Sequence, residues 1–345
     1  MSSKWSKAAV AATIALVAIV GAGFAATRSR SETATDSFDV LRLPNTIADG
    51  AHIADERGIF AKHRIRVDWT GKQAHGPAAI VSLVAGQNDA AGSVSTAMII
   101  ARTNGSKLKI IAASSTSTKE SPLHRYIVKD GSPVTGKPAD FIGKKVVSNP
   151  TTISWYPIVL LLKRAGLDYH KVEFVTLPSP LATEQALRQG AVDVIAGSEN
   201  APPGSKLFAE GGVHTLPGVS DYEVLGIEQI GGWVMREDFI QEHPDVVRRF
   251  VTSLAEAHQW ANEHPVEAKE IVNRRNGVPE AYRKYQGTWR SVPATALVDA
   301  TSIQKWIAIL EEFGQIPKDS VKADDVFTNA FNPLAALSAG NSRVP

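Results

Sequence analysis

The sequence contains no cysteine among its 345 residues. A chain without cysteine forms no disulfide bond, holds no metal through thiolates and has no thiol nucleophile. It also lacks a cysteine that could carry a lipid anchor. The net charge at pH 7 is only +2, which gives no reason to expect a nucleic-acid partner. These absences leave a protein that depends on core packing, for which a hydrophobic fraction of 43% is sufficient.

Familiar catalytic motifs are missing too. The sequence has no His-Glu-x-x-His zinc motif and no Gly-x-Ser-x-Gly nucleophile motif, and its nine histidines are scattered. The stretch 131–138 reads Gly-Ser-Pro-Val-Thr-Gly-Lys-Pro and differs from the phosphate-binding P-loop motif at one residue, Pro138. Pro138 has no hydroxyl for a magnesium ion, and Pro133 removes a backbone N–H where phosphate would bind. We therefore expect a protein that is not an enzyme and has neither cofactor nor metal.

The N-terminal segment 1–26 is typical of an export signal. Two lysines precede an apolar run over residues 8–26, and small residues surround a cleavage position after Ala25. The alternative is an uncleaved N-terminal anchor, because 19 residues just span a bilayer. Arginines at 28 and 30 follow the run and fit an outward-facing anchor poorly. Both interpretations predict a periplasmic or extracytoplasmic protein.

From Phe38 onward, strand-like alternation and helix-like periodicity take turns. This order predicts an α/β fold with parallel strand pairing. The expected strands are 40–43, 65–69, 90–94 and 109–113, and the expected helices are 51–57, 77–86 and 96–103.

The same rhythm starts again after a Ser/Thr-rich stretch at 114–121. The expected strands are 126–129, 145–148, 172–177 and 192–196, with helices at 154–164 and 183–189. A strand at 233–235 and long helices from 243, from 264 and over 301–313 then follow. We therefore predict a first lobe from 38–122, a second lobe from 123–225, and a return of 226–335 to the first lobe, with chain crossings near 114–123 and 226–232.

An internal echo supports two related lobes. The first copy is Leu83-x-x-Gly86-x-x-Asp89, and the second is Leu187-x-x-Gly190-x-x-Asp193. A Gly-Ser pair follows each aspartate, one residue later in the second copy. Each copy predicts a helix, a glycine stop and a short strand whose end faces a ligand in open α/β sheets. The alternative is chance, because such patterns recur in many α/β proteins.

Several stretches resemble a known family. They are 54–60 (Ala-Asp-Glu-Arg-Gly-Ile-Phe), 83–89, 143–146, 232–239 (Gly-Trp-Val-Met-Arg-Glu-Asp-Phe), 242–244 and 260–265, within about 38–315. On these stretches the chain resembles the substrate-binding proteins of ABC importers of the nitrate/sulfonate/taurine type, which are related to binders of thiamine-pyrimidine precursors.

The resemblance implies a periplasmic-binding-protein-like type II fold with two α/β lobes joined by a two-segment hinge. It implies a small polar or anionic solute clamped between the lobes and delivered to an ABC permease. Alternatives are a binder of a thiamine-pyrimidine precursor or a riboflavin-like heterocycle, and a pyrimidine-precursor synthase-like enzyme that needs a histidine and iron. A structural or adhesion protein is a third class. We expect a monomer without a nucleic-acid partner.

Polar residues after the predicted strands are the candidate solute contacts. They are Asn45, Thr46, Asp49, Gln73, His75, Ser93, Ser95, Thr96, Asn149, Thr151, Thr152, Ser154, Ser198, Glu199 and Asn200. The pairs 95–96 and 151–152 are each expected to open a helix, where unpaired N–H groups attract an anion. Simple N-capping is the alternative. Asp49 and Glu199 would repel a plain anion and suit a zwitterion, unless they are solvated loop acids.

Aromatic residues and a glycine pair complete the predictions. Trp155 and Tyr156 are candidate flat walls of the cleft, and Trp233 is a candidate contact at the second crossing. Gly231 and Gly232 before it either absorb a hinge rotation or form a β-bulge. His52 is expected to be packed or exposed rather than bound to solute, and Trp260 and Trp306 are expected in the core.

Overall fold

A computed structural model describes residues 37–45, 50–72, 76–148, 152–198, 201–287, 289 and 292–335. The predicted signal peptide or anchor at 1–26 lies outside the described residues. Within the described part of the chain, no helix has the length and apolar character needed to span a bilayer.

A pair of parallel strands opens the fold. Strand β1 (Asp39–Asn45) pairs with β2 (Ile65–Lys72), and Leu41 lies opposite Val67. Alternate residues such as Leu41, Leu43 and Ile65 are buried, whereas Val40 is 55% exposed. This alternation places one face of the pair on the core, as expected of a strand with a period of two residues. The short helices α1 (Gly50–Glu56) and α2 (Ile59–Lys62) connect the strands.

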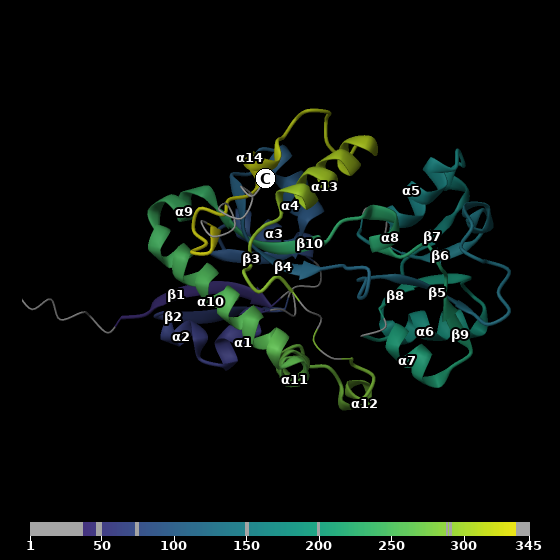
Figure 1. The fold of residues 1–345 in the computed structure, drawn as a ribbon, viewed down its shortest axis with the longest axis horizontal. Helices are drawn as coiled ribbons and strands as arrows, with labels where there is room; N and C mark the ends of the chain where they lie inside the picture. The colour runs from purple at the N-terminus through teal and green to yellow at the C-terminus, as the bar shows by residue number, and fades with distance from the viewer. Residues whose placement is uncertain are drawn as a thin grey trace, which may run out of the picture. The chain divides into compact units, whose positions relative to one another are not determined.

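A second sheet has the order β3-β10-β4. Strands β3 (Ala90–Val94) and β4 (Leu108–Thr116) both pair antiparallel with β10 (Gln229–Arg236). The expectation of parallel pairing throughout was therefore wrong here, because β10 returns from a distant part of the chain and inserts between its neighbours. Helices α3 (Gly76–Val84), α4 (Ser95–Thr103), α10 (Pro244–Glu263) and α13 (Ala300–Glu312) pack around these strands (Figure 1).

The glycine pair of β10 lies in the middle of this sheet. The strand register shifts on both sides of Gly231, which is a bulge. A Cβ atom on Gly231 would lie 2.5 Å from the carbonyl oxygen of Ser93, and one on Gly232 would lie 2.3 Å from that of Ala112. The bulge interpretation is therefore confirmed. The hinge interpretation stays a prediction, because a bulge in this sheet does not exclude a rotation at this segment.

A third sheet has the order β7-β6-β8-β5-β9. Its strands are β5 (Arg125–Lys129), β6 (Lys145–Val147), β7 (Glu173–Val175), β8 (Val194–Gly197) and β9 (Val213–Thr215). Strand β6 is parallel to β7 and β8, whereas β5 is antiparallel to β8 and β9. Helices α5 (Tyr156–Arg164), α6 (Pro180–Gln189), α7 (Gly204–Glu210) and α8 (Asp221–Leu225) belong to the same stretch of chain (Figure 1). The proposed lobe boundaries stay a prediction.

The two copies of the sequence echo form the same hydrogen bonds. Asp89 N donates to Arg42 O at 2.9 Å, and Arg42 N donates to the Asp89 carboxylate at 2.8 Å. Asp193 N donates to Lys145 O at 2.9 Å, and Lys145 N donates to the Asp193 carboxylate at 2.8 Å. Each aspartate therefore ties the start of its strand to a neighbouring strand.

The glycines of the two copies also match. Gly86 and Gly190 have positive φ values of 71° and 73°, which a side chain disfavours. Gly86 N donates to Leu83 O at 3.0 Å, and Gly190 N donates to Leu187 O at 3.1 Å. The equivalent turns after α3 and α6 favour related local structures over a chance similarity.

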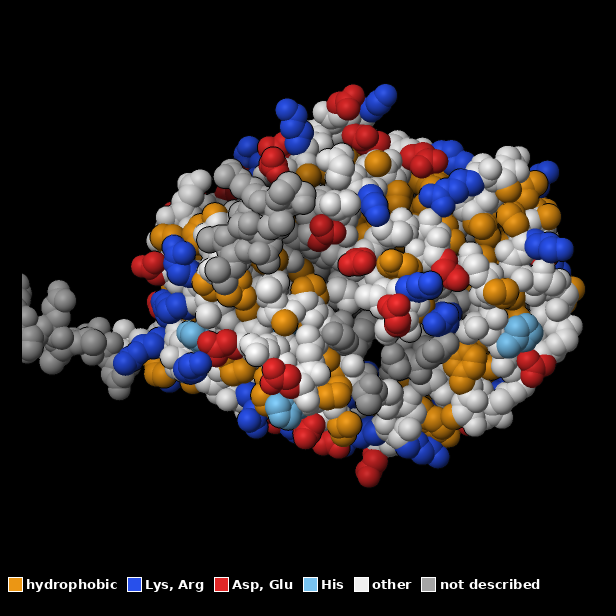
Figure 2. Space-filling model, viewed as in Figure 1, with side chains coloured by type: hydrophobic (Ala, Val, Ile, Leu, Met, Phe, Trp, Pro, Cys, Tyr) orange, Lys and Arg blue, Asp and Glu red, His pale blue; other side chains and the backbone are white. Residues whose placement is uncertain are grey.

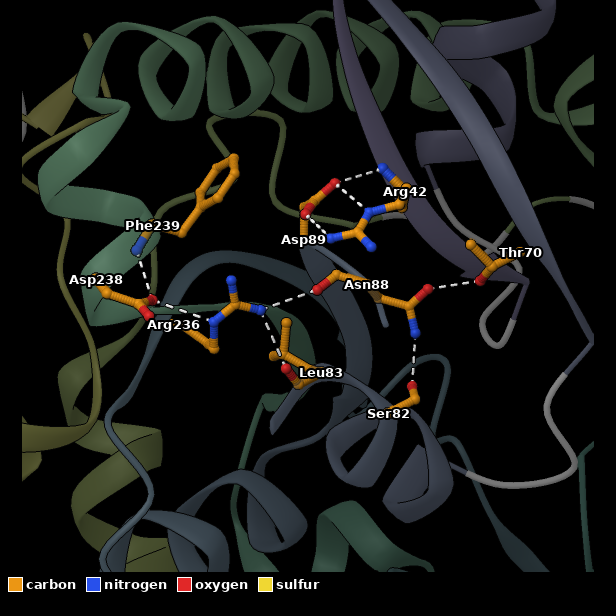
Figure 3. A network of polar contacts seen from close by, with 9 residues as sticks. All are labelled: Arg42, Thr70, Ser82, Leu83, Asn88, Asp89, Arg236, Asp238 and Phe239. Carbon is orange, nitrogen blue, oxygen red and sulfur yellow. Dashed lines mark hydrogen bonds and ion pairs between the residues drawn. The ribbon is translucent and has the colours of Figure 1, made fainter. Parts of the chain in front are cut away.

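Asn88 joins the first two sheets (Figure 3). Its side-chain oxygen accepts from the Thr70 hydroxyl at 2.5 Å, and its amide donates to the Ser82 hydroxyl at 2.6 Å. Its backbone oxygen accepts from the Arg236 guanidinium at 3.1 Å. One residue thus links β2, α3 and β10.

The long helix α10 supplies much of the core. Its predicted apolar stripe, including Val247, Phe250 and Leu254, is buried, and so is Trp306 of α13. Trp260 is only partly buried against this core. The remaining elements are η1 (Pro138–Phe141), η2 (Tyr169–Lys171), α9 (Glu237–Glu242), α11 (Pro265–Arg275), α12 (Glu280–Arg283) and α14 (Ala323–Val326).

Candidate functional site

The start of α4 is the first part of the candidate site. Ser95 and Thr96 occupy its first turn, directly after β3, and are 0% and 2% exposed. The N-cap residue is Val94, which provides no side-chain cap. The capping interpretation was therefore wrong for this pair. The first N–H groups of an α-helix have no partner within the helix and carry partial positive charge.

Buried serine hydroxyls at the ends of β3 and β4 lack partners among the described residues. The Oγ atoms of Ser93, Ser95 and Ser114 form no hydrogen bond to any part of the chain that the structure describes. All three residues are at most 1% exposed. A buried hydroxyl without a partner costs free energy, so natural proteins rarely keep one without a reason. Hydroxyls that donate to a bound solute would provide that reason.

A second group of hydroxyls follows β6. The Oγ atom of Ser154 lies 2.9 Å from that of Ser148 and 3.1 Å from Thr152 Oγ1. Helix α5 begins only at Tyr156, so Thr152 and Ser154 lie in a turn before it. The expectation that Thr152 opens a helix was wrong. The turn nevertheless brings three hydroxyls together at the carboxyl end of β6.

Ser198 directly follows the neighbouring strand β8. It forms an isolated bridge with Ala201, shortly before α7 begins. A Cβ atom on Gly204 would lie 2.3 Å from the Ser198 carbonyl oxygen. Only glycine allows the start of α7 to approach Ser198 so closely. Because β6 and β8 are parallel, Ser198 lies at the same edge of the sheet as Ser148.

Three aromatic predictions are corrected by the structure. Trp155 and Tyr156 are 7% and 0% exposed, and they pack edge-on against Phe313 and Trp306, respectively. They belong to a core cluster rather than to a cleft wall. Trp233 is 1% exposed and packs against Phe250 of α10, so the structure assigns it to the core instead of the solute site.

Asn45 is placed at the end of β1, as expected, but its side chain is already engaged. Its Oδ1 atom lies 2.9 Å from His52 Nε2, and its Nδ2 atom donates to the Arg275 carbonyl oxygen at 3.4 Å. The other predicted contacts lie outside the described residues. They are Thr46, Asp49, Gln73, His75, Asn149, Thr151, Glu199 and Asn200.

The sequence prediction missed Ser114 and Ser148. Ser114 begins the Ser/Thr-rich stretch that looked like a chain crossing, whereas β4 continues through it to Thr116. Ser148 directly follows the last residue of β6. Extending the predicted strand 109–113 by one residue would have identified Ser114, whereas Ser148 already lay at the end of the predicted strand 145–148 and was not selected.

The described site hydroxyls carry no formal charge. No group of three or more His, Cys, Asp or Glu residues among the described ranges is arranged to hold a metal ion. Figure 2 shows basic and acidic side chains interspersed over the face in view. Recognition at this site would therefore rest on directed N–H and O–H donors, which can bind an anion without a basic side chain.

Structural similarity confirms the predicted periplasmic-binding-protein-like α/β fold. The structure superposes on the periplasmic aliphatic sulphonate-binding protein of Escherichia coli with a TM-score of 0.66 and 20% identity, covering 86% of this chain and 99% of that one. The periplasmic nitrate-binding protein of Synechocystis PCC 6803 gives a TM-score of 0.60 and 17% identity, covering 89% and 90%.

Sequence comparison identifies the family. Residues 45–268 match the model of the NMT1/THI5-like family, so the chain belongs to that family. The taurine-binding periplasmic protein of Escherichia coli (strain K12) is 29% identical over 245 residues, which are 68% of this chain and 72% of that protein. The family resemblance predicted from the sequence is confirmed.

Proposed function

We propose that this protein is the extracytoplasmic solute-binding component of an ABC importer, and that it binds a small anionic solute of the sulfonate, taurine or nitrate class. Family membership supports this function, together with similarity to proteins that bind taurine, aliphatic sulfonates and nitrate. These relatives favour an oxyanion over a pyrimidine or riboflavin-like heterocycle. A membrane permease is the partner that such a function requires.

The observation that carries the proposal is the uncapped start of α4 with its buried hydroxyls. Sulfonate and nitrate oxygens are hydrogen-bond acceptors, whereas backbone N–H groups and serine hydroxyls can donate. Ser93 and Ser95 have unused donors in the part of the chain described. An anion at this position would pair them and would also interact favourably with the helix dipole.

The hydroxyl cluster of Ser148, Thr152 and Ser154 offers a second set of donors on another sheet. In the proposed mechanism, 38–122 and 226–335 form one lobe, and 123–225 form the other. The solute binds one lobe first and is then enclosed by the second. Closure occurs only to the extent that the solute prefers the closed form.

The proposal includes three further statements. The protein catalyses no reaction on its solute, it is exported by its N-terminal segment, and it acts as a monomer. The relatives described above are named as binding proteins, and the matched relatives are periplasmic, which supports the first two statements.

A binding screen tests this function. Melting temperatures should be measured with taurine, ethanesulfonate, nitrate, a thiamine-pyrimidine analogue and riboflavin, followed by titration calorimetry of each hit. We expect one or more of the anionic solutes to raise the melting temperature and to bind 1:1 without being converted, because a ligand selective for the folded state stabilises it. Binding of the heterocycles alone, formation of a product, or no binding at all would overturn the proposal.

A further inference from the structure

A polar cluster joins the carboxyl ends of β1 and β2 to two helices. It consists of Asn45 of β1, His52 and Asp55 of α1, Trp69 of β2 and Arg275 of α11, and we call these five residues the Asn45 clamp. The predicted solute contacts Thr46 and Asp49 follow β1 in the sequence, and Gln73 and His75 follow β2. The clamp therefore lies at strand ends from which solute-binding segments are expected to start.

His52 holds the side-chain oxygen of Asn45. The histidine is 1% exposed, and its Nε2 atom lies 2.9 Å from Asn45 Oδ1. An amide oxygen can only accept, so Nε2 carries the proton and donates it. The imidazole also stacks on Trp69, with ring centres 4.7 Å apart and planes 12° from parallel. Burial, followed by the charge of Arg275, lowers the pKa of His52 to about 4, so the ring is neutral at pH 7.

The other two members of the clamp, Asp55 and Arg275, hold Trp69 and the side-chain amide of Asn45 in place. Trp69 Nε1 donates to the Asp55 carboxylate at 2.8 Å, and Arg275 forms an ion pair with the same carboxylate oxygen. The Arg275 guanidinium carbon lies 5.3 Å from the Trp69 ring centre. The Arg275 carbonyl oxygen accepts from Asn45 Nδ2 at 3.4 Å.

These contacts leave Asn45 little capacity for a solute. Its oxygen accepts from His52, and one of its two amide hydrogens is directed to Arg275. The charge of Arg275 is balanced by Asp55 rather than presented to an anion. The sequence predicted Asn45 as a contact, whereas its surroundings resemble a structural joint between β1, α1 and α11.

We infer that the Asn45 clamp is a positioning device for the solute site, in which the His52–Asn45 hydrogen bond fixes the geometry of the carboxyl end of β1 relative to α1. This inference rests on the proposed function for its connection to solute. Asn45 and His52 are then positioning residues, which set the affinity without contacting the solute.

Two substitutions of His52 separate the hydrogen bond from the stacking. His52→Phe keeps a flat ring against Trp69 but has no N–H for Asn45. His52→Gln keeps a donor near the Nε2 position but loses the aromatic ring. His264→Phe is a matched control, because His264 also stacks on a tryptophan, Trp260, at 4.7 Å and 10°. Asn45→Ala removes the acceptor from the opposite side and serves as a second variant if His52→Phe does not fold.

Hydrogen–deuterium exchange of residues 41–56 in the absence of solute measures how rigidly the clamp holds this segment. Titration calorimetry with taurine, ethanesulfonate and nitrate measures how the clamp affects solute affinity. We expect His52→Phe and Asn45→Ala to accelerate exchange in this segment and to weaken binding about tenfold, the effect of one lost buried hydrogen bond. The exchange rate and the solute affinity of His52→Gln should be closer to those of the unmodified protein. Those of His264→Phe should equal them.

The two proposals can fail separately. If the unmodified protein binds none of the three solutes, the proposed function fails, and the exchange data still decide whether the hydrogen bond fixes β1. If residues 41–56 of His52→Phe exchange at the same rate as in the unmodified protein, the His52–Asn45 hydrogen bond does not fix β1 and the clamp inference is overturned. Faster exchange with unchanged affinity would overturn its role in positioning the site, and so would a loss of affinity in His264→Phe equal to that in His52→Phe.

Discussion

Replacing Ser95 with alanine should change stability and solute affinity in opposite directions. The Ser95 hydroxyl is buried and has no partner among the described residues. An unsatisfied buried hydroxyl costs about 1–3 kcal/mol, so its removal should stabilise the fold by about 1 kcal/mol. For a chain of this size, that gain corresponds to a rise in melting temperature of about 1–3 °C.

Affinity should fall because the same hydroxyl is proposed to donate to the solute. A hydrogen bond to a charged group contributes about 1.5–3 kcal/mol, which corresponds to roughly a 10- to 100-fold weaker Kd. Ser93→Ala should behave similarly, since Ser93 is also buried without a partner in the described structure. A stabilised protein that has lost affinity is the combination expected when a binding site keeps polar groups unpaired.

Ser253→Ala provides the matched control. Ser253 is equally buried, but its hydroxyl donates to the Arg249 carbonyl oxygen at 2.8 Å within α10. This substitution should lower stability and leave affinity unchanged. Chemical denaturation without solute and titration calorimetry with it measure the two quantities. The reasoning is refuted if Ser95→Ala lowers stability while affinity is retained, because the hydroxyl would then be a structural group.

Three further predictions concern acid stability, strand packing and the second hydroxyl group. Burial lowers the pKa of both His258 and His52 from 6.5 to about 4, so the stability that each contributes is complete above pH 6.5 and is lost as the pH falls towards 4. Each histidine should account for about 2 kcal/mol of the free energy of unfolding lost between pH 7 and pH 5. In urea titrations at both pH values, His258→Asn should therefore lose less free energy of unfolding than the unmodified protein. An equal loss would contradict this prediction. Gly232→Ala should destabilise the fold by about 3 kcal/mol or more, because its Cβ atom would meet a backbone oxygen at 2.3 Å, and an unchanged melting temperature would disprove the close packing. Thr152→Ala should weaken solute binding in calorimetry with little change in melting temperature, and unchanged affinity would remove Thr152 from the site.

Local sequence signals predicted most of the longer elements. Strand β3 matches its expected bounds, 90–94, and α13 starts within one residue of the expected position. Glycine stops and alternating apolar residues are local signals, so they can be recognised without knowing the tertiary structure. The sequence analysis did not predict α2, α7 and β9, which have four, seven and three residues.

The positions of three candidate site residues were predictable. Ser93 lies near the end of β3, Ser95 and Thr96 directly follow it, and all three are buried. The direction of β10 and the role of Trp233 were not predictable in the same way. Strand β10 pairs with segments more than 100 residues earlier in the chain, and the Trp233 side chain is placed by packing on α10. Local residue patterns carry little information about such distant partners.

The sequence by itself determined where many of the helices and strands form, which family the chain resembles and where several of the hydroxyls at strand ends lie. Only the tertiary structure decided which of those polar groups are already paired. Asn45 shows the difference, since one of its partners is seven residues away in the sequence and the other is 230 residues away. The residue type sets which hydrogen bonds a side chain can form, but folding determines which atoms become its partners.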